Sequence, residues 1–213
     1  MIKNKEIEIR CQATELRANP TEGRTISGYA AKFDSWSEPI MGWFKEKIDA
    51  GAFEDCDVTD VIMCFNHNPD TILARTTSDT LTISTDSIGL KFSFTAPNTT
   101  IGNDMLELVS RGDINQCSFK FIVESDEWVY ADKDNALEYD ERTILKISKL
   151  KDVSLVVYPA YKETEANVRH LEEKKVEQLK LLQSVAESSD HNNSKPINTT
   201  HRTRVTQFLQ LKK

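Results

Sequence analysis

The sequence predicts a mainly β protein with helices, of the α+β class, whose strands form a β-barrel or a curled sheet. Apolar and polar residues alternate over several short stretches, which is the period of a half-buried strand. Turn-forming residues separate these stretches at close spacing. Helical periodicity is confined to one internal and one C-terminal segment. With 213 residues, 38% of them hydrophobic, the chain can build one domain with a lean core and a tail.

The N-terminal part of the chain is expected to consist of strands and one long loop. KEIEIRCQA alternates Ile7, Ile9 and Cys11 with charged and polar residues, as in a strand with one buried face. GRTISGYAAKF is predicted to be a second strand. SEPIMGWFKEKIDAGAFEDC is predicted to be a loop with at most one short helix. DVIMCFNHNPD is predicted to run from a buried strand into a polar turn.

A hairpin and a helix are predicted next. DTLTIST and IGLKFSFTA are expected to pair around DSIG, with Leu90, Phe92 and Phe94 on one face. The following segment has helical periodicity from about 103 to 110 and a stop signal at Gly112.

The stretch NQCSFKFIV, which follows this helix, is predicted to be a strand with an aromatic stripe. Cys117, Phe119, Phe121 and Val123 fall on one face, and Ser118 falls on the opposite face among polar residues. A surface serine is the common explanation of such a pattern, so any chemistry of Ser118 depends on what the rest of the chain brings to it.

The C-terminal third is predicted to change from strand to helix. The acidic stretch DEWVYADKDNALEYDER is expected to be a long hairpin loop, and RTILKISKLKDVSLVVYPA to give one or two strands ended by Pro159. From 161 to about 188 the apolar residues recur with helical spacing, and a polar stretch with little to bury follows. The main domain is therefore placed at residues 1–172, and a C-terminal helix extension with a flexible basic tail at 173–213.

The charge distribution argues against nucleic acid as a partner. The formal net charge is -7, and residues 171–213 hold 8 Lys/Arg against 5 Asp/Glu, which leaves 19 against 29 in the first 170. An acidic body repels phosphate backbones. No apolar run is long enough to span a bilayer and the N-terminal stretch has no apolar signal core, so the protein is expected to stay in the cytosol, away from the membrane.

The cysteines do not predict disulfides or a metal site. Cys11, Cys56, Cys64 and Cys117 show no paired spacing and are expected to be reduced thiols. Cys64 and His67 form one C-x-x-H half-site, but no second half follows, so zinc is not expected. We expect no cofactor.

His67 is the histidine best placed for chemistry. It lies where a predicted strand meets a turn, which holds the imidazole and leaves it reachable. The other histidines fall in the predicted terminal helix and tail: His170, His191 and His201. A serine hydroxyl needs such a base to take its proton, which makes Ser118 the candidate nucleophile. An ordinary turn histidine remains the alternative for His67.

Asp152, in KLKDVSLVVYP, is the candidate third residue of a catalytic triad with Ser118 and His67. It lies on the strand face opposite Val153 and Leu155, as Ser154 does, and could orient the histidine. The alternatives are an exposed strand-end charge or an ion pair with Lys149 or Lys151. The order His67, Ser118, Asp152 matches none of the three commonest orders of serine hydrolases, and the chain has no G-x-S-x-G turn.

A cysteine hydrolase is a rival. Cys117 or Cys64 would then act with His67, although strand alternation turns Cys117 away from the face of Ser118.

Over about residues 5–172 the sequence resembles the prohead (procapsid) maturation proteases of tailed phages, of the Hong Kong phage type. The landmarks, in the family's order and spacing, are SGYAAKFDSWSEPI, IDAGAF, FNHNPDTILART, DSIGLKFSFTAP, ELVSRGDINQCSFKF and DVSLVVYPAYKET. The resemblance implies the fold of herpesvirus assembly proteases, which is a closed or partly open, mostly antiparallel β-barrel surrounded by helices. The family's histidine falls on His67, its serine on Ser118, and its acidic residue on Asp152, where glutamate is common in the family.

The resemblance implies a serine endopeptidase that needs no cofactor. It would act in the host cell cytoplasm, inside the assembling procapsid, and would cut the scaffold or the scaffold segment of the major capsid protein, and itself. The oxyanion donors are expected among backbone amides near Ser118 and Asp152, with Arg75 as a weaker candidate. The herpesvirus relatives imply a homodimer. The alternative is a catalytically silent barrel that serves as a structural or scaffold-binding assembly protein.

Overall fold

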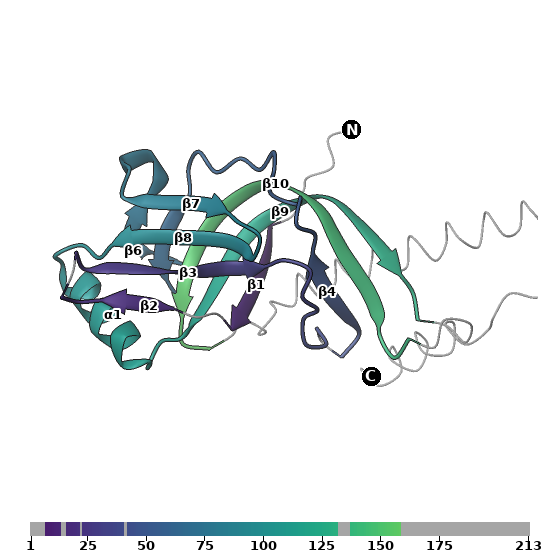
Figure 1. The fold of residues 1–213 in the computed structure, drawn as a ribbon, viewed down its shortest axis with the longest axis horizontal. Helices are drawn as coiled ribbons and strands as arrows, with labels where there is room; N and C mark the ends of the chain where they lie inside the picture. Colours follow the sequence, from purple (N-terminus) through teal and green to yellow (C-terminus); the bar gives the residue numbers. More distant parts are fainter. Residues whose placement is uncertain (1–6, 14–15, 22, 41, 132–136, 159–213) are drawn as a thin grey trace, which may run out of the picture. The chain divides into compact units, whose positions relative to one another are not determined.

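The computed structural model describes residues 7–13, 16–21, 23–40, 42–131 and 137–158 (Figure 1). These residues form ten strands, one α-helix and one short 3₁₀ helix. The elements in chain order are β1 Ile7–Ala13, β2 Arg17–Asn19, β3 Thr25–Lys32, β4 Phe44–Ile48, β5 Ile62–Phe65, β6 Asn68–Arg75, η1 Thr76–Ser78, β7 Leu81–Thr85, β8 Gly89–Thr95, α1 Thr100–Arg111, β9 Gln116–Val129 and β10 Asp140–Val156.

One sheet is organised around the long strand β10. Its order is β1-β9-β10-β5-β6, and β4 also pairs with β10. β9 lies antiparallel along one edge of β10, whereas β4 and then β5 lie parallel along the other edge. The register between β9 and β10 shifts at several points, and such irregularities bend a strand pair. Figure 1 shows this pair as a long arch.

The second sheet is antiparallel, in the order β2-β3-β8-β7. The predicted hairpin of β7 and β8 is confirmed, and Leu90, Phe92 and Phe94 are all buried. The predicted helix is also confirmed as α1, which begins three residues earlier than expected because the hydroxyl of Thr99 accepts a hydrogen bond from the backbone N–H of Gly102. The helix ends at Gly112, whose φ of 82° is the left-handed conformation of a helix C-terminus.

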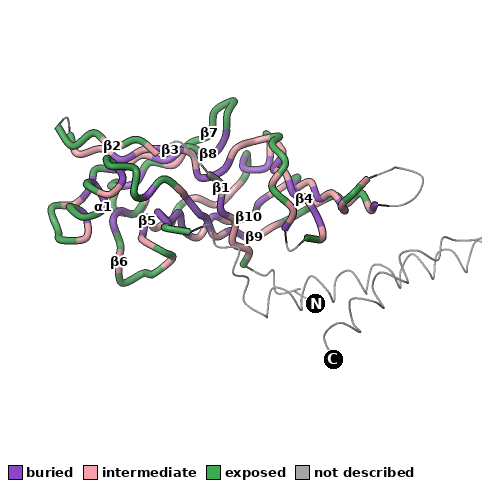
Figure 2. Tube along the Cα trace, turned by 90° about the horizontal axis from the view of Figure 1, so that it is seen from below, coloured by how far each residue is buried: buried purple, intermediate pink, exposed green. Residues whose placement is uncertain are grey.

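One hydrophobic cluster joins the two sheets. It includes Phe92 from β8, Phe119 and Phe121 from β9, Leu150 from β10 and Met105 from α1. The rings of Phe119 and Phe121 stack with centroids 4.8 Å apart. Figure 2 shows the buried stretches on β3, β8, β9 and β10. The predicted aromatic stripe of β9 therefore anchors that strand in the core.

The mainly β class is confirmed. The sheets of the described residues do not close into a barrel, so the predicted closed or partly open barrel is not confirmed. The prediction of antiparallel strands is wrong for the larger sheet, which is mixed because β4 and β5 run parallel to β10. The acidic stretch is not one long loop, since β9 continues through it to Val129 and β10 begins at Asp140. The predicted C-terminal helix and tail lie outside the described residues, and the boundary at residue 172 stays a prediction.

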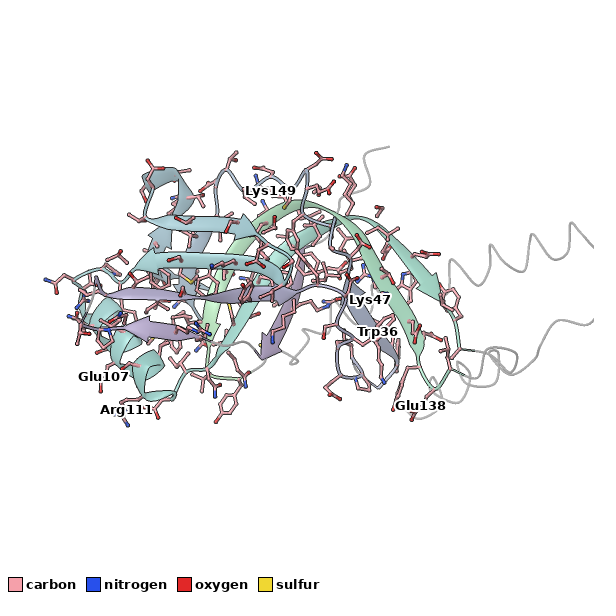
Figure 3. The ribbon with its side chains drawn as sticks, viewed as in Figure 1. Trp36, Lys47, Glu107, Arg111, Glu138 and Lys149 are labelled. Atoms are coloured by element: carbon pink, nitrogen blue, oxygen red, sulfur yellow. The ribbon has the colours of Figure 1, made fainter. Side chains whose placement is uncertain are left out.

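β4 is a strand that the sequence prediction assigned to a loop. Phe44, Glu46 and Ile48 are buried in strict alternation, but a charged residue occupies the middle position, so hydropathy does not alternate. On the other face the ammonium group of Lys47 lies 5.0 Å from the ring centroid of Trp36 (Figure 3). The buried residue in the middle of β4 is therefore Glu46, whose carboxylate must find hydrogen-bonding partners on other strands.

No helix in the described part of the chain has both the length and the hydropathy required to cross a membrane.

Candidate active site

His67 lies in a tight turn between β5 and β6. Asn66 and His67 both have positive φ values, 51° and 57°, and Phe65 pairs with Asn68 across the turn. This is the two-residue hairpin turn in which asparagine followed by glycine is the usual sequence. A side chain at the glycine position costs about 1 kcal/mol or more, and this cost must be offset by the contacts that hold the residue in place.

Ser118 lies in the middle of β9, between β1 and β10. Its Oγ is 2.6 Å from Nε2 of His67 and 2.9 Å from the backbone carbonyl oxygen of Arg10. A hydroxyl has one proton, so these two acceptors compete for it. Ser118 is also fully buried. Attack on a substrate carbonyl therefore requires the hydroxyl to give its proton to His67 and not to Arg10.

Asp152 completes a line of hydrogen bonds through His67. Its Oδ1 is 2.5 Å from Nδ1 of His67, and its Oδ2 is 3.3 Å from the ammonium group of Lys120. An ionised carboxylate can only accept, so Nδ1 carries the imidazole proton and Nε2 is left to accept from Ser118. Asp152 does not pair with Lys149, as one alternative had it, because Lys149 is bound to Asp57 at 2.6 Å.

The three side chains proposed from the sequence are thus brought together by the fold. They come from the β5–β6 turn, β9 and β10, and the parallel pairing of β5 with β10 sets Ile62 opposite Asp152 and Cys64 opposite Ser154. This register places the turn that follows β5 next to the polar face of β10. Antiparallel pairing of β10 with β9 sets Ser154 opposite Ser118.

Two further polar residues of the site, Lys120 and Ser154, were given no role by the sequence analysis. Lys120 lies two residues after Ser118, and Ser154 two residues after Asp152, so strand alternation turns each toward the same face as its neighbour. Lys120 also donates to the backbone oxygen of His67 at 3.4 Å. The alternation of side chains along a strand could have indicated both residues, but alternation does not tell which polar residues are buried.

The thiols of the site region are poor nucleophiles. Burial raises the pKa of the Cys117 thiol well above its ordinary value, and burial likewise raises the pKa of Cys64. Cys117 faces the core, whereas the Sγ of Cys64 lies 3.0 Å from the Oγ of Ser154. A reactive cysteine needs a stabilised thiolate, so this environment disfavours the cysteine alternative.

Arg75 is poorly placed to stabilise an oxyanion at Ser118. It lies at the opposite end of β6 from His67, and its exposed guanidinium binds the carboxylate of Asp60 through two hydrogen bonds, of 2.7 and 2.9 Å. Backbone amides therefore remain the expected oxyanion donors.

A buried charge cluster links β1, which pairs with β9 beside Ser118, to β4 and β10. Arg142 of β10 is 1% exposed and donates to Glu8, Glu46 and Asp126, each at 2.7–2.8 Å. Arg10 binds Glu46 at 2.7 Å. Burial alone would lower the pKa of Arg142, but the carboxylates of Glu8 and Glu46 outweigh it and keep the pKa above its usual value. Because Glu8 and Arg10 both belong to β1, the cluster fixes the strand whose carbonyl contacts Ser118.

A serine, a histidine and an aspartate in this arrangement can carry out nucleophilic acyl transfer. A family model described as caudovirus prohead serine protease matches residues 12–180. This range contains all six sequence landmarks and all three candidate residues. Comparisons with curated proteins and with solved structures give no significant match.

Proposed function

The chain belongs to the caudovirus prohead serine protease family, as its sequence landmarks predicted, and on this premise we propose that it is a serine endopeptidase with Ser118, His67 and Asp152 as its catalytic triad. The observation that carries the proposal is the unbroken line of contacts from Asp152 through His67 to Ser118, at 2.5 and 2.6 Å. Family membership gives the class of enzyme, and this line of contacts supports the residue roles.

His67 acts first as a base in the proposed mechanism. Its Nε2 takes the proton of Ser118 as Oγ attacks the scissile carbonyl, and Asp152 stabilises the imidazolium that forms. The oxyanion is held by backbone amides. His67 then donates its proton to the leaving amine, and water hydrolyses the acyl-enzyme by the same route.

Membership of the family supports a proposal for the substrates. We propose that the enzyme acts inside the assembling procapsid, in the host cytoplasm, on the scaffold or the scaffold segment of the major capsid protein. Removing these segments clears the interior of the shell for expansion and packaging. Hydrolysis by this route uses only the three side chains, backbone amides and water, so it calls for no cofactor.

A catalytically silent assembly protein of the same family is the rival function. The full burial of Ser118 is the observation that favours it. Against it stands the reach of Asp152 to Nδ1 of His67, because this contact leaves Nε2 to accept the proton of Ser118, as a general base must.

The test is co-expression with the coat and scaffold proteins, with Ser118→Ala beside the wild type and Ser148→Ala as the control. Ser148 is a half-buried serine of β10 whose hydroxyl donates to the backbone oxygen of Ile122, so its loss leaves the triad intact. Intact masses of all partners are measured. Loss of the nucleophile of a working triad lowers the rate by roughly a million-fold.

Defined fragments in the wild type and in Ser148→Ala, but not in Ser118→Ala, are expected. Identical masses in all three samples would refute the protease and leave the assembly protein. Self-cleavage is read in the same spectra, because the Ser118→Ala chain is expected to keep residues 190–213 and the active chain to lose them. Equal chain masses would rule out self-cleavage in this segment.

A further inference from the structure

We propose that Ser154 is a positioning residue of the active site, whose hydroxyl fixes both Asp152 and the turn that carries His67. The proposal rests on the triad proposed above. Ser154 is fully buried on β10, directly across from Ser118 of β9.

The hydroxyl of Ser154 has a partner for each of its hydrogen-bonding positions. Its proton goes to Oδ1 of Asp152, at 3.1 Å, because a carboxylate is the strongest acceptor nearby. Its oxygen accepts from the backbone N–H of His67 at 3.2 Å, and the thiol of Cys64 lies at 3.0 Å. One donor and two acceptor sites are all that a serine hydroxyl offers.

These contacts meet at the strained residue of the site. Oγ of Ser154 lies 3.1 Å from Nδ1 of His67 and binds the backbone N–H of the same residue. His67 is held in the left-handed conformation, which is unfavourable for any residue except glycine. A hydrogen bond to its own backbone N–H is a direct means of keeping the residue in this conformation.

The hydroxyl of Ser154 also fixes the orientation of the Asp152 carboxylate. Oδ1 accepts from both Nδ1 of His67 and Oγ of Ser154, so the carboxylate cannot turn without breaking two bonds. The orientation of Asp152 fixes the plane of the imidazole, and this plane aims Nε2 at Ser118. Ser154 thus acts on catalysis only through its two partners and touches no reacting atom.

The experiment measures the rate at which a fluorophosphonate labels Ser118 in the full chain, followed by intact mass. This rate reports the nucleophilicity of the serine and needs no knowledge of the substrate. Ser154→Ala is expected to label about ten- to a hundred-fold more slowly than the wild type, because it removes hydrogen bonds to a charged and to a backbone group. Ser148→Ala, on the same strand, is expected to label at the wild-type rate.

A double-mutant cycle separates positioning from packing. In the Asp152→Asn background, Ser154→Ala is expected to slow labelling by a smaller factor than in the wild type, because only the hydrogen bond to the backbone N–H of His67 is then left to lose. Equal effects of Ser154→Ala in both backgrounds would overturn the proposal, as would a single variant that labels within about threefold of the wild type. If Ser154→Ala does not melt cooperatively, Ser154→Cys in reducing buffer takes its place. This variant has a weaker donor of similar shape and is expected to label about tenfold more slowly; a wild-type rate would overturn the proposal.

The same labelling data distinguish a failure of the proposed catalytic triad from a failure of the proposed role of Ser154. A wild-type chain that neither labels at Ser118 nor cleaves the coat protein would overturn the proposed function, and the role of Ser154 with it. A wild-type chain that labels beside an equally fast Ser154→Ala would overturn the role of Ser154 alone.

Discussion

Replacing Asp152 by asparagine is expected to invert the tautomer of His67 and so to abolish activity. Oδ2 of Asp152 faces the ammonium group of Lys120, which can only donate, so the asparagine oxygen will turn to that side. The amide NH₂ then faces Nδ1 of His67 and donates to it. Nε2 becomes the protonated nitrogen and can no longer accept from Ser118.

The size of the effect follows from that loss of the base. An aspartate-to-asparagine change that leaves the geometry intact but gives the wrong tautomer lowers kcat about 10⁴-fold, which corresponds to about 5.5 kcal/mol of activation free energy. The assay is the cleavage rate of a peptide that spans a mapped site, with thermal unfolding to show that the variant is folded. Asp60→Asn, which changes an exposed carboxylate bound to Arg75, is the control and is expected to keep full activity.

A second variant tests the orientation argument itself. In Lys120→Met/Asp152→Asn the asparagine oxygen is released to face His67, where Ser154 also donates, so part of the activity is expected to return. Activity of Asp152→Asn within about tenfold of the wild type would refute the role of Asp152. A double variant no faster than Asp152→Asn would refute the reasoning about the amide.

Three predictions concern stability. Arg142→Ala is expected to lower the free energy of unfolding by about 3–5 kcal/mol, measured in urea, because it removes the buried guanidinium shared by Glu8, Glu46 and Asp126 and leaves Glu8 and Glu46 with the guanidinium of Arg10. Gly89→Ala is expected to lower it by about 3 kcal/mol, since the new Cβ would lie 1.9 Å from the backbone oxygen of Ala31. The hydrogen bond from Lys149 lowers the pKa of Asp57 below its unfolded value of about 3.9, so the stability difference between wild type and Asp57→Asn is expected to be present at neutral pH, to begin to shrink as the pH falls below about 4, and to be lost as the pH falls through the lower pKa of the folded state.

Each of these has an outcome that contradicts it. Arg75→Ala, which removes an exposed ion pair, is the control for Arg142, and equal urea midpoints for the two variants would show that the buried cluster contributes little. Gly51→Ala is the steric control, because a Cβ at that position would meet only side-chain atoms, the nearest being Oδ1 of Asp49 at 3.3 Å. Equal losses for the two glycine variants would refute the clash with Ala31. A stability difference for Asp57→Asn that persists unchanged at pH 2 would mean that the carboxylate is not the titrating group.

Local pattern was sufficient for much of the fold. Alternation located β1, β3, β8 and β9, because each of these strands has one apolar face. A short apolar run located β5, and the glycine stop located the end of α1. Alternation failed at β4, whose buried middle residue is Glu46. It also failed in the acidic stretch, where the end of β9 carries exposed charges and the start of β10 buries the charged residues Asp140 and Arg142.

The sequence alone determined which side chains could do chemistry. One histidine at the end of a strand, one serine opposite an aromatic stripe and one aspartate opposite an apolar face are properties of residue type and of a period of two. Family landmarks then gave them an order and a class of reaction. None of this required coordinates, because residue type and strand alternation are local.

Only the tertiary structure decided how these groups meet. The parallel register of β5 on β10 is set by packing between segments about ninety residues apart, and it alone brings His67 to Asp152. The same register brings Ser154 into contact with both residues, and the pairing of β1 with β9 places the backbone carbonyl of Arg10 next to Ser118. Pairing between distant strands depends on the whole core, so no local pattern can specify it.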